Sequence, residues 1–180
     1  SPDGRHLATG SKTGEVLFRD TTTGQVVRSW KTPRRPTGDT ESNGGVSQLA
    51  YRPDGQEILV ACTYSWDGKK ADGASDYKYD HRAMVCDIEN GTMRRDYPGE
   101  KSEPYIGFMP GGRQVMIEDT LWDNQAGQKV RKLRGESPSP RGVFASDGRH
   151  ALVTNVLWDL NEGRRVRSFE AQAGETALRW

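Results

Sequence analysis

Residues 156–163 read Val-Leu-Trp-Asp-Leu-Asn-Glu-Gly, so a short apolar run ends in Asp159 and a glycine follows four positions later. The same Asp-to-Gly spacing occurs three more times, at Asp20–Gly24, Asp87–Gly91 and Asp123–Gly127. Asp87 lies 67 residues after Asp20, and the next two aspartates follow at intervals of 36 residues. A fixed period between about 20 and 50 residues is typical of repeat architectures. The spacing therefore predicts a chain made of four related units.

Each unit has a second signature, a turn-forming group that precedes the aspartate. These groups are Pro2-Asp3-Gly4, Pro53-Asp54-Gly55, Gly111-Gly112 and Asp147-Gly148. Short runs of Val, Leu, Ile and aromatic residues surround both signatures, bounded by Gly, Asp, Asn and Pro, which is typical of strands and turns. No long segment has an apolar period of 3.6 residues, so we expect few helices. Four short antiparallel strands per unit predict an all-β fold of propeller blades. The expected units span about 1–30, 46–97, 104–133 and 140–169.

The sequence resembles the WD-repeat family of β-propellers. The resemblance rests on residues 1–11 (Ser-Pro-Asp-Gly-Arg-His-Leu-Ala-Thr-Gly-Ser), on 14–20 with Thr23-Gly24-Gln25, and on the pairs Trp122-Asp123 and Trp158-Asp159. The first two units have Phe18-Arg19-Asp20 and Val85-Cys86-Asp87 instead of a Trp-Asp pair, and no unit has the Gly-His pair of the family. We therefore do not expect the hydrogen-bond network that the family builds on that histidine. This looser style is similar to bacterial WD-repeat proteins, whose arrays often sit beside other domains.

The ends of the chain leave two arrangements open. Residues 1–4 begin at the turn that follows the first strand of a unit, and residues 176–180 (Thr-Ala-Leu-Arg-Trp) have the pattern of that first strand. In one arrangement this strand closes a ring of four blades. In the other, the chain is an open arc, a fragment of a longer array with further blades, and 176–180 begins the next blade. We favour the arc because WD-repeat propellers usually close with more than four blades.

Composition gives no support for nucleic acid or a membrane as partner. The 180 residues have a formal net charge of +1, 33% hydrophobic residues and a mean hydropathy of −0.85. A nearly neutral chain gives no reason to expect nucleic acid or a membrane as partner. No run approaches the length of about 18 apolar residues that a membrane span needs.

The two cysteines, Cys62 and Cys86, align about four positions apart on neighbouring strands, or roughly 13 Å at ~3.3 Å per residue. A disulfide needs Cα atoms within about 7 Å, so we expect two free, buried thiols. Free thiols weakly favour a reducing, cytoplasmic location.

The second unit carries a long insertion in its middle hairpin. Gly55 and Asp87 are 32 residues apart, whereas the equivalent Gly4 and Asp20 are 16 residues apart. The inserted segment, 63–82, mixes aromatic residues with Asp, Gly and Ser, a composition typical of recognition surfaces. Its candidate binding residues are Tyr64, Trp66, Asp67, Tyr77, Tyr79, Asp80 and His81. The alternative is a solvated hairpin extension packed on a neighbouring blade.

The insertion does not have the pattern of a metal site. Asp67, Asp72, Asp76, Asp80 and His81 could supply ligands, but their spacing matches no EF-hand loop. No zinc spacing, nucleophile elbow or phosphate-binding Gly loop occurs elsewhere. We therefore expect no metal, no cofactor and no catalytic residues, and His6 and His150 share one repeat position.

A column of arginines occupies one aligned place in the last strand of every unit: Arg28, Arg95, Arg131 and Arg167. Charged residues on edge strands suppress aggregation through the edge. The functional alternative is a basic rim that binds acidic partners or phosphates.

Smaller differences between the units give further expectations. The segment 31–45 and the run Ser137-Pro138-Ser139-Pro140 are polar and Pro-rich, which predicts loops between blades. The third and fourth units should have very short middle hairpins, near 118–120 and 154–155, because only 11 residues separate Gly112 from Asp123 and Gly148 from Asp159.

These patterns favour a non-catalytic interaction or scaffold module whose partner is another protein or a neighbouring domain. This function is expected in part from the predicted fold alone. The alternative is a part or accessory domain of a propeller-containing enzyme, with the active site outside this segment or at the central channel.

Overall fold

The computed structural model describes residues 1–37, 40–69, 73, 75–99, 105–133, 142–145, 147–153 and 155–169. Their regular structure is entirely β, so the expectation of few helices is confirmed, and none of these residues lies in a helix that could span a membrane. The segment 176–180 and the run 137–140 lie outside the described residues. The strands form four successive antiparallel sheets and one small hairpin.

The first sheet has three strands and the other three sheets have four, each in sequence order. Blade 1 contains β1 (His6–Gly10), β2 (Glu15–Asp20) and β3 (Val26–Lys31). Blade 2 contains β6 (Gly45–Tyr51), β7 (Glu57–Lys69), β8 (Ser75–Asp87) and β9 (Met93–Pro98). Blade 3 contains β10 (Ile106–Phe108), β11 (Gln114–Ile117), β12 (Thr120–Asp123) and β13 (Lys129–Lys132). Blade 4 contains β14 (Gly142–Phe144), β15 (His150–Val153), β16 (Val156–Asp159) and β17 (Arg164–Ser168).

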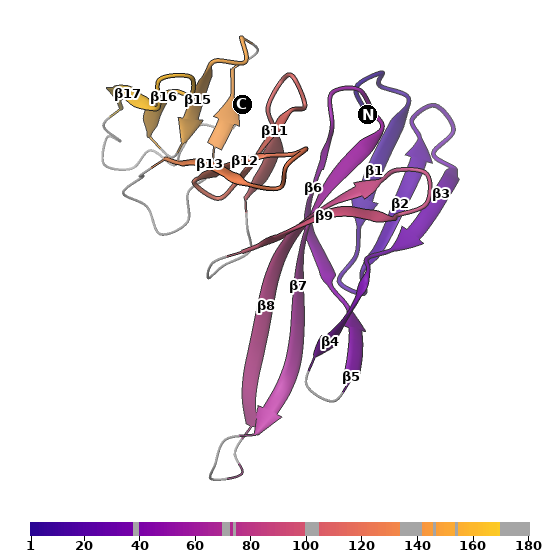
Figure 1. Ribbon diagram of the computed structural model, residues 1–180. Helices are drawn as coiled ribbons and strands as arrows, with labels where there is room; N and C mark the ends of the chain where they lie inside the picture. The colour runs from indigo at the N-terminus through magenta and orange to yellow at the C-terminus, as the bar shows by residue number, and fades with distance from the viewer. Residues whose placement is uncertain are drawn as a thin grey trace.

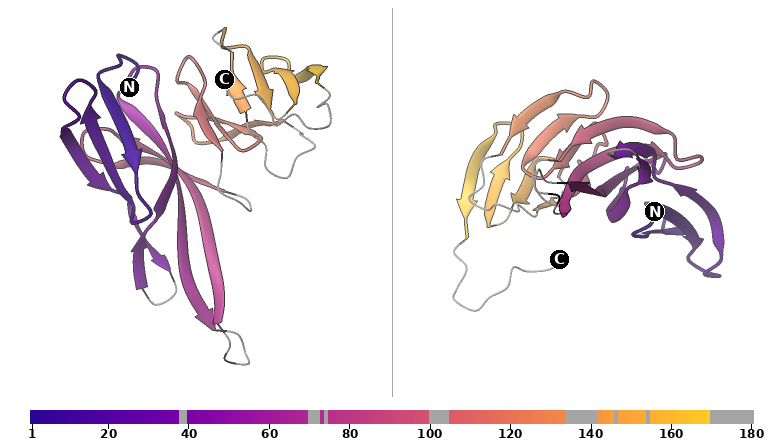
Figure 2. Two further views of the ribbon diagram at one scale, coloured as in Figure 1. Left: turned by 180° about the vertical axis from the view of Figure 1, so that it is seen from behind. Right: turned by 90° about the horizontal axis from the view of Figure 1, so that it is seen from below.

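The four described sheets follow one another along an open arc (Figures 1 and 2). Each sheet runs from a first strand (β6, β10 and β14 in blades 2 to 4) to an outer edge strand (β3, β9, β13 and β17), which is the order expected of propeller blades. The prediction of antiparallel propeller blades arranged in an open arc is confirmed. In blade 1, β1 is an edge strand of the sheet.

The repeated aspartate is explained by the turn that it closes. One carboxylate oxygen of Asp159 accepts hydrogen bonds from the amides of Asn161 and Glu162, and the amide of Gly163 donates to the Asp159 carbonyl. The other three aspartates make the same pair of side-chain bonds, at distances of 2.7–3.3 Å: Asp20, Asp87 and Asp123. The glycines all have φ between 64° and 72°, a left-handed conformation that costs other residues free energy.

Apolar side chains fill the spaces between consecutive blades. Phe18 of blade 1 packs with Ile58, Val60 and Met84 of blade 2. Equivalent buried clusters join blade 2 to blade 3 and blade 3 to blade 4. The stability of each blade therefore depends on burial against its neighbours.

The two tryptophans of the Trp-Asp pairs belong to these clusters. Trp122 packs on blade 2 and Trp158 packs on blade 3. Among the described residues, neither buried indole N–H has a hydrogen-bond partner. Trp122 and Trp158 therefore serve as packing residues between blades.

The prediction of a loop over 31–45 is wrong. Residues of this segment form a two-stranded hairpin of β4 (Arg34–Thr37) and β5 (Thr40–Asn43). Pro36 is tolerated because each strand of an isolated hairpin has an unpaired edge, where a missing amide proton breaks no ladder bond.

The other expectations about the hairpins and cysteines are confirmed. β11 and β12 join through Glu118 and Asp119 only, and β16 begins at Val156 after β15 ends at Val153. In the ladder of β7 and β8, Cys62 lies opposite Arg82 and Cys86 lies opposite Ile58, so the two cysteines are offset by four positions along the strands. Both thiols are buried and free. Burial raises the pKa of each thiol to about 12.

Two glycines allow the packing between blades to be tested separately from turn strain. Gly24 and Gly91 have nearly equal φ, 71° and 72°, but a Cβ on Gly91 would lie 2.6 Å from the Trp30 ring of blade 1, whereas one on Gly24 would meet nothing within 4 Å. We expect Gly24→Ala to cost about 1–2 kcal/mol of unfolding free energy from the backbone alone. Gly91→Ala should cost about 1–3 kcal/mol more because it overpacks the Trp30 contact. Urea denaturation of both variants measures the difference, and equal losses would contradict the proposed contact.

In blade 4, an ion pair with Arg149 also stabilises the turn that Asp159 closes, and this stabilisation depends on pH. Arg149 donates two hydrogen bonds of 2.7 and 2.9 Å to Asp159, and these bonds, with those of the turn amides, lower the pKa of Asp159 from 3.8 to about 2. A carboxylate with a lowered native pKa stabilises the fold above its ordinary pKa, and this stability is lost as pH falls toward the native pKa.

Asp159→Asn keeps the turn acceptor but removes the charge. We expect it to be less stable than the natural protein near neutral pH, and the difference to shrink between about pH 4 and pH 2. Asp20→Asn is the control, since the Asp20 carboxylate has no arginine partner among the described residues. Chemical denaturation as a function of pH checks both, and a difference that is constant with pH would refute the role of the ion pair.

Candidate recognition surface

The inserted segment is a continuous β-ribbon. β7 and β8 are each 13 residues long and pair in one register without a bulge, from Glu57 with Asp87 to Lys69 with Ser75. The far half of this hairpin extends away from the arc beside the smaller β4–β5 hairpin (Figure 1). We call residues 63–69 and 75–82 the ribbon. A regular ladder fixes which side chains share a face, because consecutive residues of a strand alternate.

One face of the ribbon displays tyrosines. Tyr77 and Tyr79 are 68% and 59% exposed, and they lie directly opposite Asp67 and Ser65. Tyr79 stacks on His81 with ring centroids 6.3 Å apart, and the His81 ring is hydrogen-bonded to the Thr63 hydroxyl at 2.9 Å. We call this the tyrosine face, made of residues 63, 65, 67, 77, 79 and 81. Four of the candidate binding residues share it: Asp67, Tyr77, Tyr79 and His81.

The other three candidates lie on the opposite face. Trp66 and Asp80 are half-buried, whereas Tyr64 is fully buried in the core between blades 1 and 2. The Tyr64 hydroxyl donates to the carbonyl of Pro33 at 2.8 Å, and burial raises the pKa of Tyr64. Tyr64 is therefore part of the core, and the expectation of an exposed contact residue is corrected there.

An ion cluster fixes the base of the ribbon. Arg82 donates two hydrogen bonds of 3.0 and 2.7 Å to Asp96 of β9. Arg35 of β4 also pairs with Asp96, pairs with Asp80 at 3.4 Å, and lies 5.7 Å from the centre of the Tyr64 ring. Burial acts against the charged form of Arg82, but the hydrogen bonds and charge of Asp96 keep its pKa above the ordinary value. The cluster ties β4, β8 and β9 together, which sequence spacing alone does not reveal.

The ribbon does not gather a metal site among the residues that the structure describes. No group of three or more His, Cys, Asp or Glu side chains there is arranged to hold an ion. Asp72, one of the candidate ligands, lies outside the described residues.

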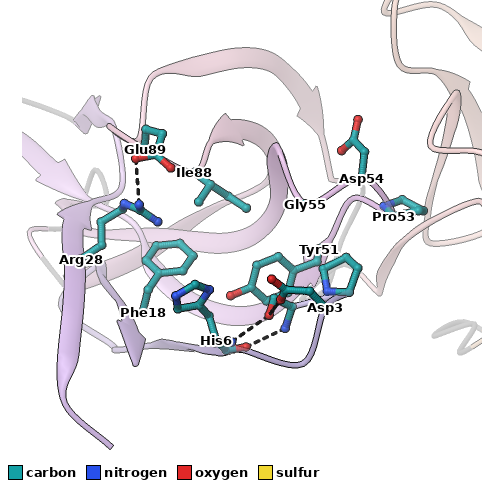
Figure 3. A pocket seen from close by; sticks show the side chains of 12 residues that line it. Asp3, His6, Phe18, Arg28, Tyr51, Pro53, Asp54, Gly55, Ile88 and Glu89 are labelled. Atoms are coloured by element: carbon teal, nitrogen blue, oxygen red, sulfur yellow. Dashed lines mark hydrogen bonds and ion pairs between the residues drawn. The ribbon is translucent and has the colours of Figure 1, made fainter. Parts of the chain in front are cut away.

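A hollow of about 490 Å³ lies between blades 1 and 2 (Figure 3). The Pro-Asp-Gly turns of both blades border it, with the rings of Phe18 and Tyr51 and the Arg28–Glu89 ion pair of 2.8 Å. Burial raises the pKa of Tyr51, whose hydroxyl has no partner among the described residues. Sequence reasoning missed this hollow, because it arises from the way two repeats are placed side by side.

The arginine column lies on the outer strands, as expected, but three of its members contact the next blade. Arg28 pairs with Glu89, Arg95 donates to the carbonyl of Gln125, and Arg131 donates to the carbonyl of Leu160 at 3.2 Å. Each acceptor belongs to the Asp-to-Gly turn of the following blade. These contacts give Arg28, Arg95 and Arg131 a structural role, and a basic rim stays a prediction.

Comparison with known proteins shows the fold and no family. No protein-family model matches the chain, and no curated protein matches it. Among solved structures, the β-propeller domain of Myceliophteria thermophila Cps50 (Swd1) is similar, with a TM-score of 0.68 and 18% sequence identity. The match covers 97% of this chain and 55% of that structure. The chain thus spans about half the length of a propeller domain and shares its fold.

Proposed function

We propose that this chain is a non-catalytic interaction module and that the tyrosine face of the ribbon recognises a protein partner. The observation that carries the proposal is the display of Tyr77 and Tyr79, two large aromatic side chains that are 68% and 59% exposed on one face of a regular ladder. Tyrosine supplies a large amphipathic contact area and loses little conformational entropy on binding. Such residues are enriched among those that dominate binding energy.

The rigidity of the ribbon supports the same conclusion. The ladder pairs thirteen residues of each strand, and the Arg35–Asp96–Arg82 cluster holds its base. The stack on His81 also restricts the Tyr79 ring before any partner arrives. A surface that is ordered in advance loses less entropy on binding.

The second candidate is an accessory domain of a propeller-containing enzyme, which would use the hollow between blades 1 and 2. The ribbon is favoured because two of its aromatic residues, Tyr77 and Tyr79, are exposed on one face. In the hollow, Glu89 and Arg28 already neutralise each other, so two of its charged groups have a structural role.

The first experiment identifies the partner and maps its contact. A photo-reactive amino acid at position 77 should cross-link the partner, whereas the same group at position 78 should not, because Lys78 lies on the opposite face. Equal cross-linking from both positions would contradict the assignment of the face.

The second experiment measures the energy of the contact with the captured partner. We expect the double substitution Tyr77→Ser and Tyr79→Ser to lower affinity by at least about tenfold, since truncating one dominant contact residue costs about 2 kcal/mol. Lys78→Ser is the matched control and should leave affinity nearly unchanged. Unchanged binding of the double variant would exclude the tyrosine face.

A shortened protein gives an independent check. Replacing residues 66–78 with Asn-Gly should preserve the fold, because it keeps Tyr64, Asp80 and Arg82 in place. It should weaken binding, because it removes Asp67 and Tyr77 from the tyrosine face. Circular dichroism verifies the fold of this variant.

A further inference from the structure

The outer edge of β8 is long and regular. β9 pairs with β8 from Cys86 to Arg82, and no described strand pairs with the part of β8 that belongs to the ribbon, apart from β7. The β4–β5 hairpin lies on the side of β7 (Figure 1). From Ser75 to Arg82 this edge has no proline and no bulge in its ladder with β7. Natural edge strands usually carry such features, because a regular edge is a template for another strand.

One hydrogen bond shows which backbone groups of β8 point toward this edge. The amide of Gly99, just after β9, donates to the carbonyl of His81 at 2.8 Å. In an antiparallel ladder, the N–H and C=O of one residue point to the same side, and the side alternates along the strand. Tyr79, Tyr77 and Ser75 have the same parity as His81. Their N–H and C=O groups therefore point outward, to a side where no described strand pairs with them.

The side chains of this edge alternate in charge. Asp76 and Lys78 flank Tyr77 and lie on the face opposite the tyrosines. Their cross-strand neighbours on β7 are Gly68 and Trp66, neither of which is charged. If a second β8 strand runs antiparallel with its Tyr77 opposite Tyr77, Asp76 of each strand lies opposite Lys78 of the other. The edge is therefore complementary to itself, which is what a two-fold contact requires.

We propose that two copies of this chain pair through the outer edges of β8, antiparallel and about a two-fold axis at Tyr77. Tyr77 exchanges backbone hydrogen bonds with Tyr77 of the other copy, and Ser75 does so with Tyr79. Asp76 and Lys78 form an ion pair on each side of the axis. The two ribbons then make one four-stranded sheet. Directly opposed residues share a face of a sheet, so the two tyrosine faces become one continuous surface.

Other two-fold registers match the edge less well. An axis at Lys78 would place the two Lys78 side chains directly opposite each other, and an axis at Asp76 would do the same for Asp76, which is unfavourable for like charges. An axis at Tyr79 would pair Tyr77 with His81, whose carbonyl already accepts the Gly99 amide. The axis at Tyr77 combines opposite charges with backbone groups that have no described partner.

The contact is separate from the proposed function. It uses the backbone of β8 and the charged face, and it leaves the rings of Tyr77 and Tyr79 exposed in both copies. Recognition of a partner by one tyrosine face therefore does not require the dimer, and either proposal can fail without the other. A dimer would offer two tyrosine faces side by side, which strengthens binding to a partner with two recognition segments.

Sedimentation velocity over a range of concentrations tests the dimer. The chain, with a mass of 20.1 kDa, should form a species of twice that mass. Lys78→Asp and Asp76→Lys should each weaken dimerisation at least about tenfold, because each replaces two attractive pairs with two repulsive ones. An equimolar mixture of the two variants should restore the dimer, since every opposed pair then has opposite charges. Lys12→Asp, at an exposed position between β1 and β2, is the control and should change nothing.

Cysteine cross-linking tests the register. Tyr77→Cys should form a disulfide between copies on mild oxidation, because opposed hydrogen-bonded residues have Cα atoms about 5.5 Å apart, within disulfide reach. Tyr79→Cys should not, since the two positions are offset by four residues, or roughly 13 Å. The natural thiols are buried and do not compete.

Circular dichroism shows whether each variant is folded. A chain that is monomeric at every concentration would overturn the proposal. So would a mixture of Lys78→Asp and Asp76→Lys that stays monomeric, equal cross-linking from positions 77 and 79, or a dimer that persists when residues 66–78 are replaced with Asn-Gly.

Discussion

The aspartate that closes each turn is the constraint on which the arc depends. Its carboxylate holds two backbone amides, as in Asp159 with Asn161 and Glu162, and so fixes the connection between the last two strands of a blade. The same turn offers its carbonyls and side chains to the arginine of the preceding blade, as Gln125 does to Arg95. The repeat aspartate is a local turn signal in the sequence. In the structure it also determines how neighbouring sheets pack, because the turn that it closes binds the arginine of the preceding blade. Apolar clusters supply the bulk of the stabilisation, and the turn gives them a common geometry.

Blade 2 carries the ribbon as an extension of its middle hairpin and still packs against its neighbours as the other blades do. The part of β7 and β8 that precedes the ribbon is ordinary blade, with Leu59 and Val85 buried toward blade 3. The change to an exposed ribbon occurs near Tyr64, whose ring is buried while its strand continues outward. The β4–β5 hairpin and the Arg35 cluster occupy the corner where the ribbon leaves the arc. The insertion is thus supported on one side and open on the other, and the tyrosine face is the open side.

The sequence predicted the blades, the short hairpins near Glu118 and the free cysteines, because these depend on local spacing and on strand periodicity. It failed for residues 31–45, since the polar side chains and Pro36 conceal a hairpin that is held by contacts with a distant ribbon. It placed seven candidate binding residues in one segment but could not divide them between faces, because the register of β7 with β8 decides that division. The partners of Arg28 and Arg95 lie 61 and 30 residues away. Contacts over such separations follow from the packing of blades and leave no local pattern in the sequence.

Because the ladder of β7 and β8 has no bulge, the face on which Tyr77 and Tyr79 lie depends on whether the number of residues between them and the core is odd or even. One residue inserted into or deleted from β8 between Tyr79 and the core would turn both tyrosines to the side that faces Arg35. Changes of an even number of residues would preserve the face and alter only its distance from the arc, by ~3.3 Å per residue. The chain between the two strands is free of this restriction. Variation in ribbon length can therefore tune how far the aromatic pair reaches, provided that it proceeds in steps of two.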